Sequence, residues 1–329
     1  MGKFLVILLW GIGATQAATL TQVPPPPTPS GIPTTAGYIS ECVGISETGV
    51  AACNFTYSWK VYVNRFCCRR QRDVAAVYSD GVTKALIAPP GEMYTRVGGI
   101  TPGGKSWGVS SPDLSTFNVV VWDTNGVPTK YGAGTPVDAD DLGRIAMGAS
   151  IYDPATAAWN VVPGALSMLA LSNNGDAVGI FSWPDNGGIE HVAAYRVSDF
   201  LSHGAEDVCV YPCIDVGAMS PEKMRMNGSG VVVGYQAFFS LPAISFRAIP
   251  GAFAEKFSGM ALTGVNDLGD AVGGVSILRP NGTTDMLPQS GDGFTVFGGL
   301  SINSSGTVVG AGMATVGVSS LRRGGIVTP

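Results

Sequence analysis

The sequence predicts an all-β protein, a β-propeller of about seven four-stranded blades. The 329-residue chain contains 46 Gly and 22 Pro, which interrupt it too often for long helices. One phrase, an apolar residue followed by turn formers, Gly and then Val-x-Gly, recurs along the chain. From the copy at Gly49 to the copy at Gly306, the six intervals average about 43 residues, which is typical of a propeller blade. The alternative is a β-solenoid, whose repeats are usually shorter and more uniform.

Each copy of the phrase predicts a tight β-hairpin. Asn and Asp tolerate left-handed backbone, Gly adopts positive φ without strain, and Val on the far side favours extended chain. The second Gly predicts a place where backbones crowd together, near the axis or at a bulge. With the two apolar runs that follow, each unit predicts four short antiparallel strands. The regular copies centre on Gly175, Gly230, Gly269 and Gly306, and the degenerate ones on Gly49, Gly104 and Gly143.

The N-terminus has the features of a cleavable signal peptide, residues 1–17. Lys3 provides a positive charge, residues 4–10 are apolar, and Thr15 and Ala17 place small side chains at positions −3 and −1 of the cleavage site. We therefore predict a secreted protein, which is extracellular or, in a bacterium, periplasmic. Neither this stretch nor a later one is long enough to predict a membrane-spanning helix.

Residues 18–35 precede the repeats and contain an alternating run, residues 19–23, and a Pro-rich segment, residues 23–33. The Pro-rich segment predicts a stiff, extended spacer. The repeat domain, residues 36–329, leaves only residues 326–328 for the last strand of its final unit. Because a propeller must join its last blade to its first, we predict that residues 19–23 complete the seventh sheet. A disordered tail is the alternative.

The repeats resemble the extracellular HAF-repeat family, whose units join an Asn-x-x-Gly-x-Val-Val-Gly hairpin to an Ala-aromatic strand. The resemblance covers residues 36–329 and is closest in the last four units. His191-Val-Ala-Ala-Tyr195 is the nearest approach to a literal His-Ala-Phe. The resemblance implies a secreted repeat protein with a propeller-like fold, without a general enzymatic activity and without catalytic residues to carry over.

Six cysteines fit an oxidising compartment. A zinc site would need His partners or two Cys-x-x-Cys pairs, and the only histidines are His191 and His203. We therefore predict disulfides rather than a metal site. The predicted pairs are Cys209 with Cys213, and Cys42 or Cys53 with Cys67 or Cys68.

Two units carry long insertions, residues 53–73 and 198–222, and insertions in repeat folds often form the binding face. The first is aromatic and basic in a chain of net charge −5, which indicates a recognition surface for an acidic or glycan partner. The alternative is a disulfide-linked hairpin whose aromatic side chains only pack on the rim. The binding candidates are Trp59, Tyr62, Arg69 and Arg70.

Other functional classes find little support in the sequence. The basic residues form no stripe, which argues against binding to nucleic acid or to anionic membranes. No nucleophile elbow or carboxylate pair stands out, and residues 138–143 match a calcium loop poorly, so we expect no catalytic residue, metal or cofactor. In a eukaryote, Asn54 and Asn281 are the candidate glycosylation positions.

We therefore predict a secreted, non-catalytic repeat protein that acts as a binding or interaction module for an extracellular glycan or protein. The alternative is an extracellular carbohydrate-active enzyme that uses the central channel of the propeller. Two facing carboxylates in the channel would favour the enzyme. A channel lined by Gly, Ser and Val would favour the binding module.

Overall fold

The computed structural model describes residues 18–63, 66–162, 165–174, 176–182, 190–196, 214–215, 223–236, 243–249, 255–316 and 319–329. None of these residues is helical, so they contain no helix that could cross a bilayer. They form seven four-stranded antiparallel sheets, which we number as blades 1–7 along the chain. Several predictions lie outside the described residues: the signal peptide, Gly175, His203, Cys209, Cys213 and most of residues 198–222.

Blade 1 contains β2 (Gly37–Ile45), β3 (Ala51–Val63), β4 (Phe66–Ser79) and β5 (Val82–Ala85). Blade 2 contains β6 (Tyr94–Ile100), β7 (Ser106–Ser111), β8 (Asn118–Trp122) and β9 (Pro128–Ala133). Blade 3 contains β10 (Asp138–Ala139), β11 (Ile145–Met147), β12 (Ser150–Asp153) and β13 (Ala158–Val161). Blade 4 contains β14 (Ala165–Leu171), β15 (Asp176–Ser182), β16 (Glu190–Arg196) and β17 (Ile214–Asp215).

Blade 5 contains β18 (Lys223–Met226), β19 (Val232–Gln236), β20 (Ile244–Ala248) and β21 (Glu255–Ser258). Blade 6 contains β22 (Gly264–Val265), β23 (Ala271–Gly273), β24 (Ser276–Leu278) and β25 (Thr284–Met286). Blade 7 contains β26 (Phe294–Ile302), β27 (Val308–Val316), β28 (Ser319–Thr328) and, from the other end of the chain, β1 (Thr19–Gln22).

The first strand of each blade is the innermost one. The strands β2, β6, β10, β14, β18, β22 and β26 each contact the next, and β26 contacts β2. These contacts close a ring of seven inner strands around a central channel. The predicted β-propeller is therefore confirmed, with one blade for each copy of the turn phrase.

The predicted hairpin turn follows the inner strand in every blade. The residue that heads the turn donates its N–H to the carbonyl four residues later, and its side-chain oxygen accepts the N–H of that same residue. Gly230, Gly269 and Gly306 occupy equivalent positions in these turns, with φ values of 80°, 84° and 81°. The prediction is confirmed for these three glycines. The turn heads, all buried, are Ser46, Thr101, Asp140, Ser172, Asn227, Asn266 and Asn303.

The second Gly of the phrase lies where two backbones meet. In blade 7, the register of β26 against β27 shifts between Gly299 and Ser301, which marks a bulge in the inner strand. A Cβ atom added to Gly310, on the facing strand, would overlap the carbonyl oxygen of Gly298. Only Gly fits at such a close approach, as the sequence predicts.

The N-terminal strand closes the ring. β1 pairs antiparallel with β28, from Thr19 opposite Thr328 to Gln22 opposite Gly325. The N–H of Val23 then donates to the carbonyl oxygen of Gly324 over 3.0 Å. The predicted pairing of this run with the seventh sheet is confirmed, so blade 7 contains both ends of the described chain.

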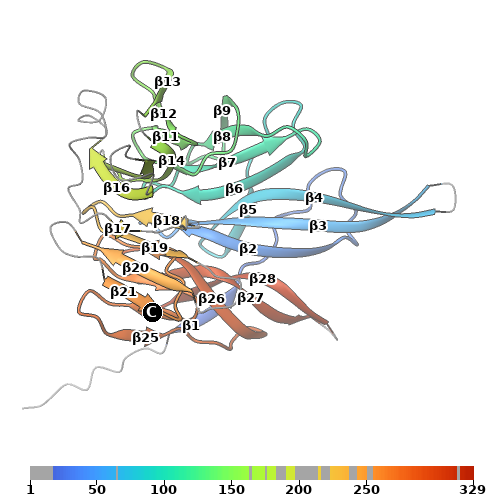
Figure 1. Ribbon diagram of the computed structural model, residues 1–329. Coiled ribbons are helices and arrows are strands. Elements are labelled where there is room, and N and C mark those ends of the chain that lie inside the picture. The colour runs from blue at the N-terminus through green and yellow to red at the C-terminus, as the bar shows by residue number, and fades with distance from the viewer. Residues whose placement is uncertain are drawn as a thin grey trace, which may run out of the picture.

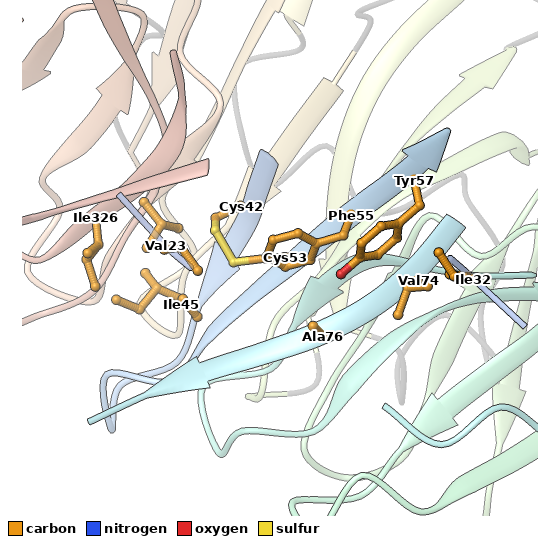
Figure 2. Packing of buried hydrophobic residues seen from close by; sticks show 12 residues of the cluster. Val23, Ile32, Cys42, Ile45, Cys53, Phe55, Tyr57, Val74, Ala76 and Ile326 are labelled. Carbon is orange, nitrogen blue, oxygen red and sulfur yellow. A yellow bond between two sulfur atoms is a disulfide. The ribbon is translucent and has the colours of Figure 1, made fainter. Parts of the chain in front are cut away.

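A buried cluster joins this closure to blade 1. Figure 2 shows Val23 and Ile326 beside Ile45 of β2, with the Cys42–Cys53 disulfide between them and the aromatic side chain of Phe55. Burial of several large apolar side chains favours the closed ring, since each contributes about 1.5–3 kcal/mol when fully buried.

Candidate functional site

The seven turns form a continuous hydrogen-bonded ring around one end of the channel. In blades 5, 6 and 7 the side-chain Nδ2 of Asn227, Asn266 and Asn303 donates to the carbonyl of the next turn head, over 2.8, 3.0 and 3.1 Å. The last of these bonds reaches Ser46 and thereby joins blade 7 to blade 1. The remaining blades are joined through the residues next to the turn heads: Glu47 to Pro102, Gly103 to Asp141, Asp141 to Asn173, and Asn174 to Gly228.

Inside this ring the channel contains a cavity of about 400 Å³. Small residues make up much of its wall, among them Gly44, Gly99, Gly264 and Ser301. The charged residues that line it are Glu47, Asp138, Arg225 and Asp267.

The carboxylates of this cavity hold the blades together. Asp138 is buried, and its two oxygens accept the N–H groups of Leu171 and Ala139 over 2.9 and 3.0 Å. Burial raises the pKa of Asp138, whereas the nearby Arg225 opposes the increase. Glu47 accepts the N–H of Ser304, and Asp267 accepts the N–H of Gly228. Each of these three carboxylates therefore accepts a backbone N–H from a neighbouring blade.

The segment that faintly matches a calcium loop is also engaged within the protein. Asp140 pairs with Arg144, and Asp141 accepts hydrogen bonds from Thr101 and from the N–H of Gly103. Across the described residues, no three His, Cys, Asp or Glu side chains gather in a group that could hold a metal ion.

Two basic side chains enter the channel from the inner strand of blade 5. Lys223 and Arg225 are two residues apart on β18 and share one face, where both are partly buried, whereas Met224 and Met226 on the other face are buried. The guanidinium of Arg225 lies 5.7 Å from the ring centre of Trp107 in blade 2, on the far side of the channel. The sequence signal for these residues was the Lys-Met-Arg-Met alternation directly before a turn phrase.

The first insertion is a long hairpin, in which β3 and β4 project far beyond the other strands (Figure 1). β2 pairs with β3 only as far as Ser58, and β5 pairs with β4 only from Ala76 onward. Residues 59–63 and 66–70 therefore form a two-stranded ribbon with no further strand beside it among the described residues. We call this ribbon the arm.

The arm separates the four predicted binding residues onto two faces. Trp59 lies opposite Arg70 on one face, and Tyr62 shares the other face with Arg69, because side chains alternate along each strand. Trp59 is partly buried and packs against the buried cluster that contains Val23, Ile326 and the Cys42–Cys53 disulfide, as the alternative of rim packing predicts. Tyr62 is 72% exposed.

The sequence analysis did not identify Lys60 as a binding residue, but Lys60 lies on the same exposed face of the arm as Tyr62 and Arg69. It lies directly opposite Arg69 in the ribbon, and both side chains are exposed. Two like charges in this position destabilise a β-ribbon. The sequence contains Lys60, but only the register of β3 against β4 reveals its partner.

The predicted disulfide between the first cysteines and the adjacent pair is wrong. Cys42 and Cys53 lie opposite each other in the register of β2 and β3 and are bonded to each other. Cys67 and Cys68 lie opposite Tyr62 and Val61 in the arm and are exposed free thiols. The arm is too extended for its cysteines to reach the buried pair at its base.

One of the two predicted glycosylation positions is contradicted. Asn54 is buried, and its side-chain amide bonds both the carbonyl and the N–H of Val97, over 3.0 and 2.8 Å. This amide joins blade 1 to blade 2 and leaves no room for a glycan in the folded protein. Asn281 is exposed in a turn of blade 6 and stays a prediction.

No family model matches the chain, and no curated protein matches it either. Among solved structures, the chain is similar to a protein of unknown function from Dyadobacter fermentans, with a TM-score of 0.43, 13% identity, and coverage of 94% of this chain and 97% of the other. It is also similar to a Trypanosoma rangeli sialidase in complex with 2,3-difluorosialic acid, with a TM-score of 0.22 and 8% identity. That match covers 86% of this chain and 39% of the sialidase chain.

Proposed function

We propose that this protein is a secreted, non-catalytic interaction module of the extracellular HAF-repeat type, and that its arm binds an acidic extracellular partner, a glycan or a protein. The observation that carries the proposal is the pair of directly opposed cations, Lys60 and Arg69, beside the exposed ring of Tyr62.

The charge of the arm supports an acidic partner. Lys60, Arg69 and Arg70 are concentrated on a projecting ribbon of a chain whose net charge is −5. An acidic ligand would remove the repulsion between Lys60 and Arg69 when it binds, so the unfavourable pair favours the complex over the free protein. Tyr62 adds apolar contact area with few rotatable bonds to immobilise.

Charged side chains on unpaired strand edges also have a structural use, because they prevent edge-to-edge aggregation. Charge reversal separates the two roles. The double variant Lys60→Glu, Arg69→Glu keeps charges on the ribbon and should resist edge-to-edge aggregation as the wild type does, but it should not bind an acidic ligand.

The test is an array of neutral, carboxylated and sulfated glycans together with acidic peptides. We expect the wild-type chain to bind acidic members, and the double variant to lose this binding. The matched control is Lys84→Glu, Lys256→Glu, which makes the same charge change at exposed positions outside the arm. Equal binding by the wild type and the arm variant would refute the proposal.

A carbohydrate-active enzyme is the second candidate, favoured by the raised pKa of Asp138 in the channel. A glycosidase requires two carboxyl groups about 5–10 Å apart around the scissile bond. Asp138 already accepts two backbone hydrogen bonds, which is typical of a structural carboxylate. Turnover of a glycan in a hydrolase screen, lost in Asp138→Asn, would favour this candidate instead.

A further inference from the structure

We propose that the channel contains a second binding site, distinct from the arm, in which Lys223 holds the carboxylate of a small organic monoanion with an apolar body. This site is independent of the proposed function of the arm and goes beyond it.

Lys223 lines a cavity of about 330 Å³ that adjoins the turn-ring cavity at Val43. A volume of this size is at the lower end of the range for small-molecule sites, about 300–1,000 Å³. Apolar side chains and backbone form most of the wall, including Val97, Val109, Phe117 and Pro136. An apolar wall with few polar groups is typical of a ligand site.

Within the part of the chain that the structure describes, the ammonium group of Lys223 has no hydrogen bond and no ion pair. The neighbouring charges are occupied elsewhere. Arg96 and Arg322 both pair with Glu41, over 3.6 and 2.5 Å. Arg225 donates to the carbonyl of Met224 over 3.0 Å and lies over Trp107. A partly buried cation without a partner is unfavourable, and a ligand anion would stabilise it.

The electrostatics of Lys223 agree with this geometry. Burial, followed by repulsion from Arg225, lowers the pKa of Lys223 to about 7, whereas Asp138 and Glu41 raise it only in part. An anion bound to the ammonium group would raise this pKa. The charged groups around Lys223 are therefore Glu41 on β2, Arg96 on β6, Asp138 on β10 and Arg225 on its own strand.

The apolar wall selects the charge of the ligand. The cost of removing an anion from water grows with the square of its charge, whereas its attraction to the Lys223 ammonium group grows only in proportion to the charge, so a carboxylate fits better than a dianionic phosphate. The apolar wall beside Phe117 favours a hydrocarbon body over a polyhydroxylated one.

The experiment measures how fast an amine-selective acylating reagent modifies Lys223 in the full chain as a function of pH, read by peptide mass spectrometry. The probes are benzoate, phenylacetate and isovalerate, with benzamide as the neutral control and phenyl phosphate as the dianion. We expect each carboxylate to slow the modification of Lys223 and to shift its pH midpoint upward. Benzamide should have no effect, and phenyl phosphate a smaller one than benzoate.

Calorimetric titration with benzoate provides a readout that does not depend on labelling. We expect Lys223→Met to weaken benzoate binding about tenfold or more, because one charge-assisted hydrogen bond is lost. Lys84→Met, at an exposed position, should bind as the wild type does. Lys223→Met should fold, since it replaces a desolvated charge by an apolar side chain of similar length.

Three results would overturn the proposal: no protection of Lys223 by any of the carboxylates, protection by phenyl phosphate equal to or above that by benzoate, or undiminished benzoate binding in Lys223→Met. None of these depends on the arm, so the two proposals fail separately.

Discussion

Leu20 offers a direct test of ring closure, because it is the side chain that β1 buries in blade 7. It is 4% exposed and belongs to the cluster that contains Leu287, Phe294 and Val327. Replacement by Ala removes apolar contacts and leaves a cavity, which in cores costs about 2–5 kcal/mol. β1 is an edge strand that can partly relax, so we expect a loss of about 3 kcal/mol in the free energy of unfolding of Leu20→Ala.

Urea unfolding of the mature chain, followed by circular dichroism and tryptophan fluorescence, measures this loss. Thr19→Ala is the matched control, since Thr19 is exposed on the same strand and should change stability by less than about 0.5 kcal/mol. If Leu20→Ala and Thr19→Ala have equal unfolding midpoints, β1 does not stabilise the closed ring, and the N-terminal run is a disordered tail.

Three further predictions concern the turns, the cysteines and the channel. Asn303→Ala removes one of the two hydrogen bonds to the carbonyl of Ser46, which keeps the bond from Gly49, and it leaves the N–H of Thr307 without its partner. This variant should lower the free energy of unfolding by about 2–4 kcal/mol, whereas Ser304→Ala keeps its backbone bond and should have little effect; equal urea midpoints would contradict this. Under native conditions an alkylating reagent should modify Cys67 and Cys68 but reach Cys42 and Cys53 only after reduction, as read from peptide masses; modification of Cys42 without reductant would be the opposite result. The pKa of Lys223 is lowered to about 7 in the folded chain, whereas an unfolded Lys has a pKa of about 10.4. Between about pH 7 and pH 10 the unfolded chain therefore binds more protons than the folded chain, so wild-type stability rises with pH over this range. Lys223→Met should therefore raise the melting temperature more at pH 6 than at pH 9.5, and an equal increase at both values would count against the lowered pKa.

The propeller could be predicted from the sequence because its determinants are local and repeated. Each turn is specified by its own Asn, Ser or Asp at the head and by Gly at the position with positive φ, as Asn266 and Gly269 illustrate. Closure by β1 could also be predicted, because a blade that lacks one strand requires it from elsewhere in the chain.

The binding surfaces depend on pairings between residues that are distant in sequence. The register of β3 against β4 places Lys60 opposite Arg69 and separates Cys53 from Cys67. Neither arrangement can be predicted from the amino-acid composition of residues 53–73. In the channel, Lys223 is surrounded by side chains from blades 1, 2, 3 and 5, which only the closed ring brings together. The same long-range contact explains Asn54, a sequon that the neighbouring blade buries.

The central claim is that the exposed face of the arm recognises an acidic partner. The most direct measurement is the dissociation constant of the mature chain for the strongest acidic ligand from the array, at low and at physiological salt, for the wild type and for Lys60→Glu, Arg69→Glu. We predict wild-type binding that weakens as salt increases, a loss of about tenfold or more in the arm variant, and wild-type affinity in Lys84→Glu, Lys256→Glu. An arm variant that binds as tightly as the wild type, with the same dependence on salt, would contradict the claim.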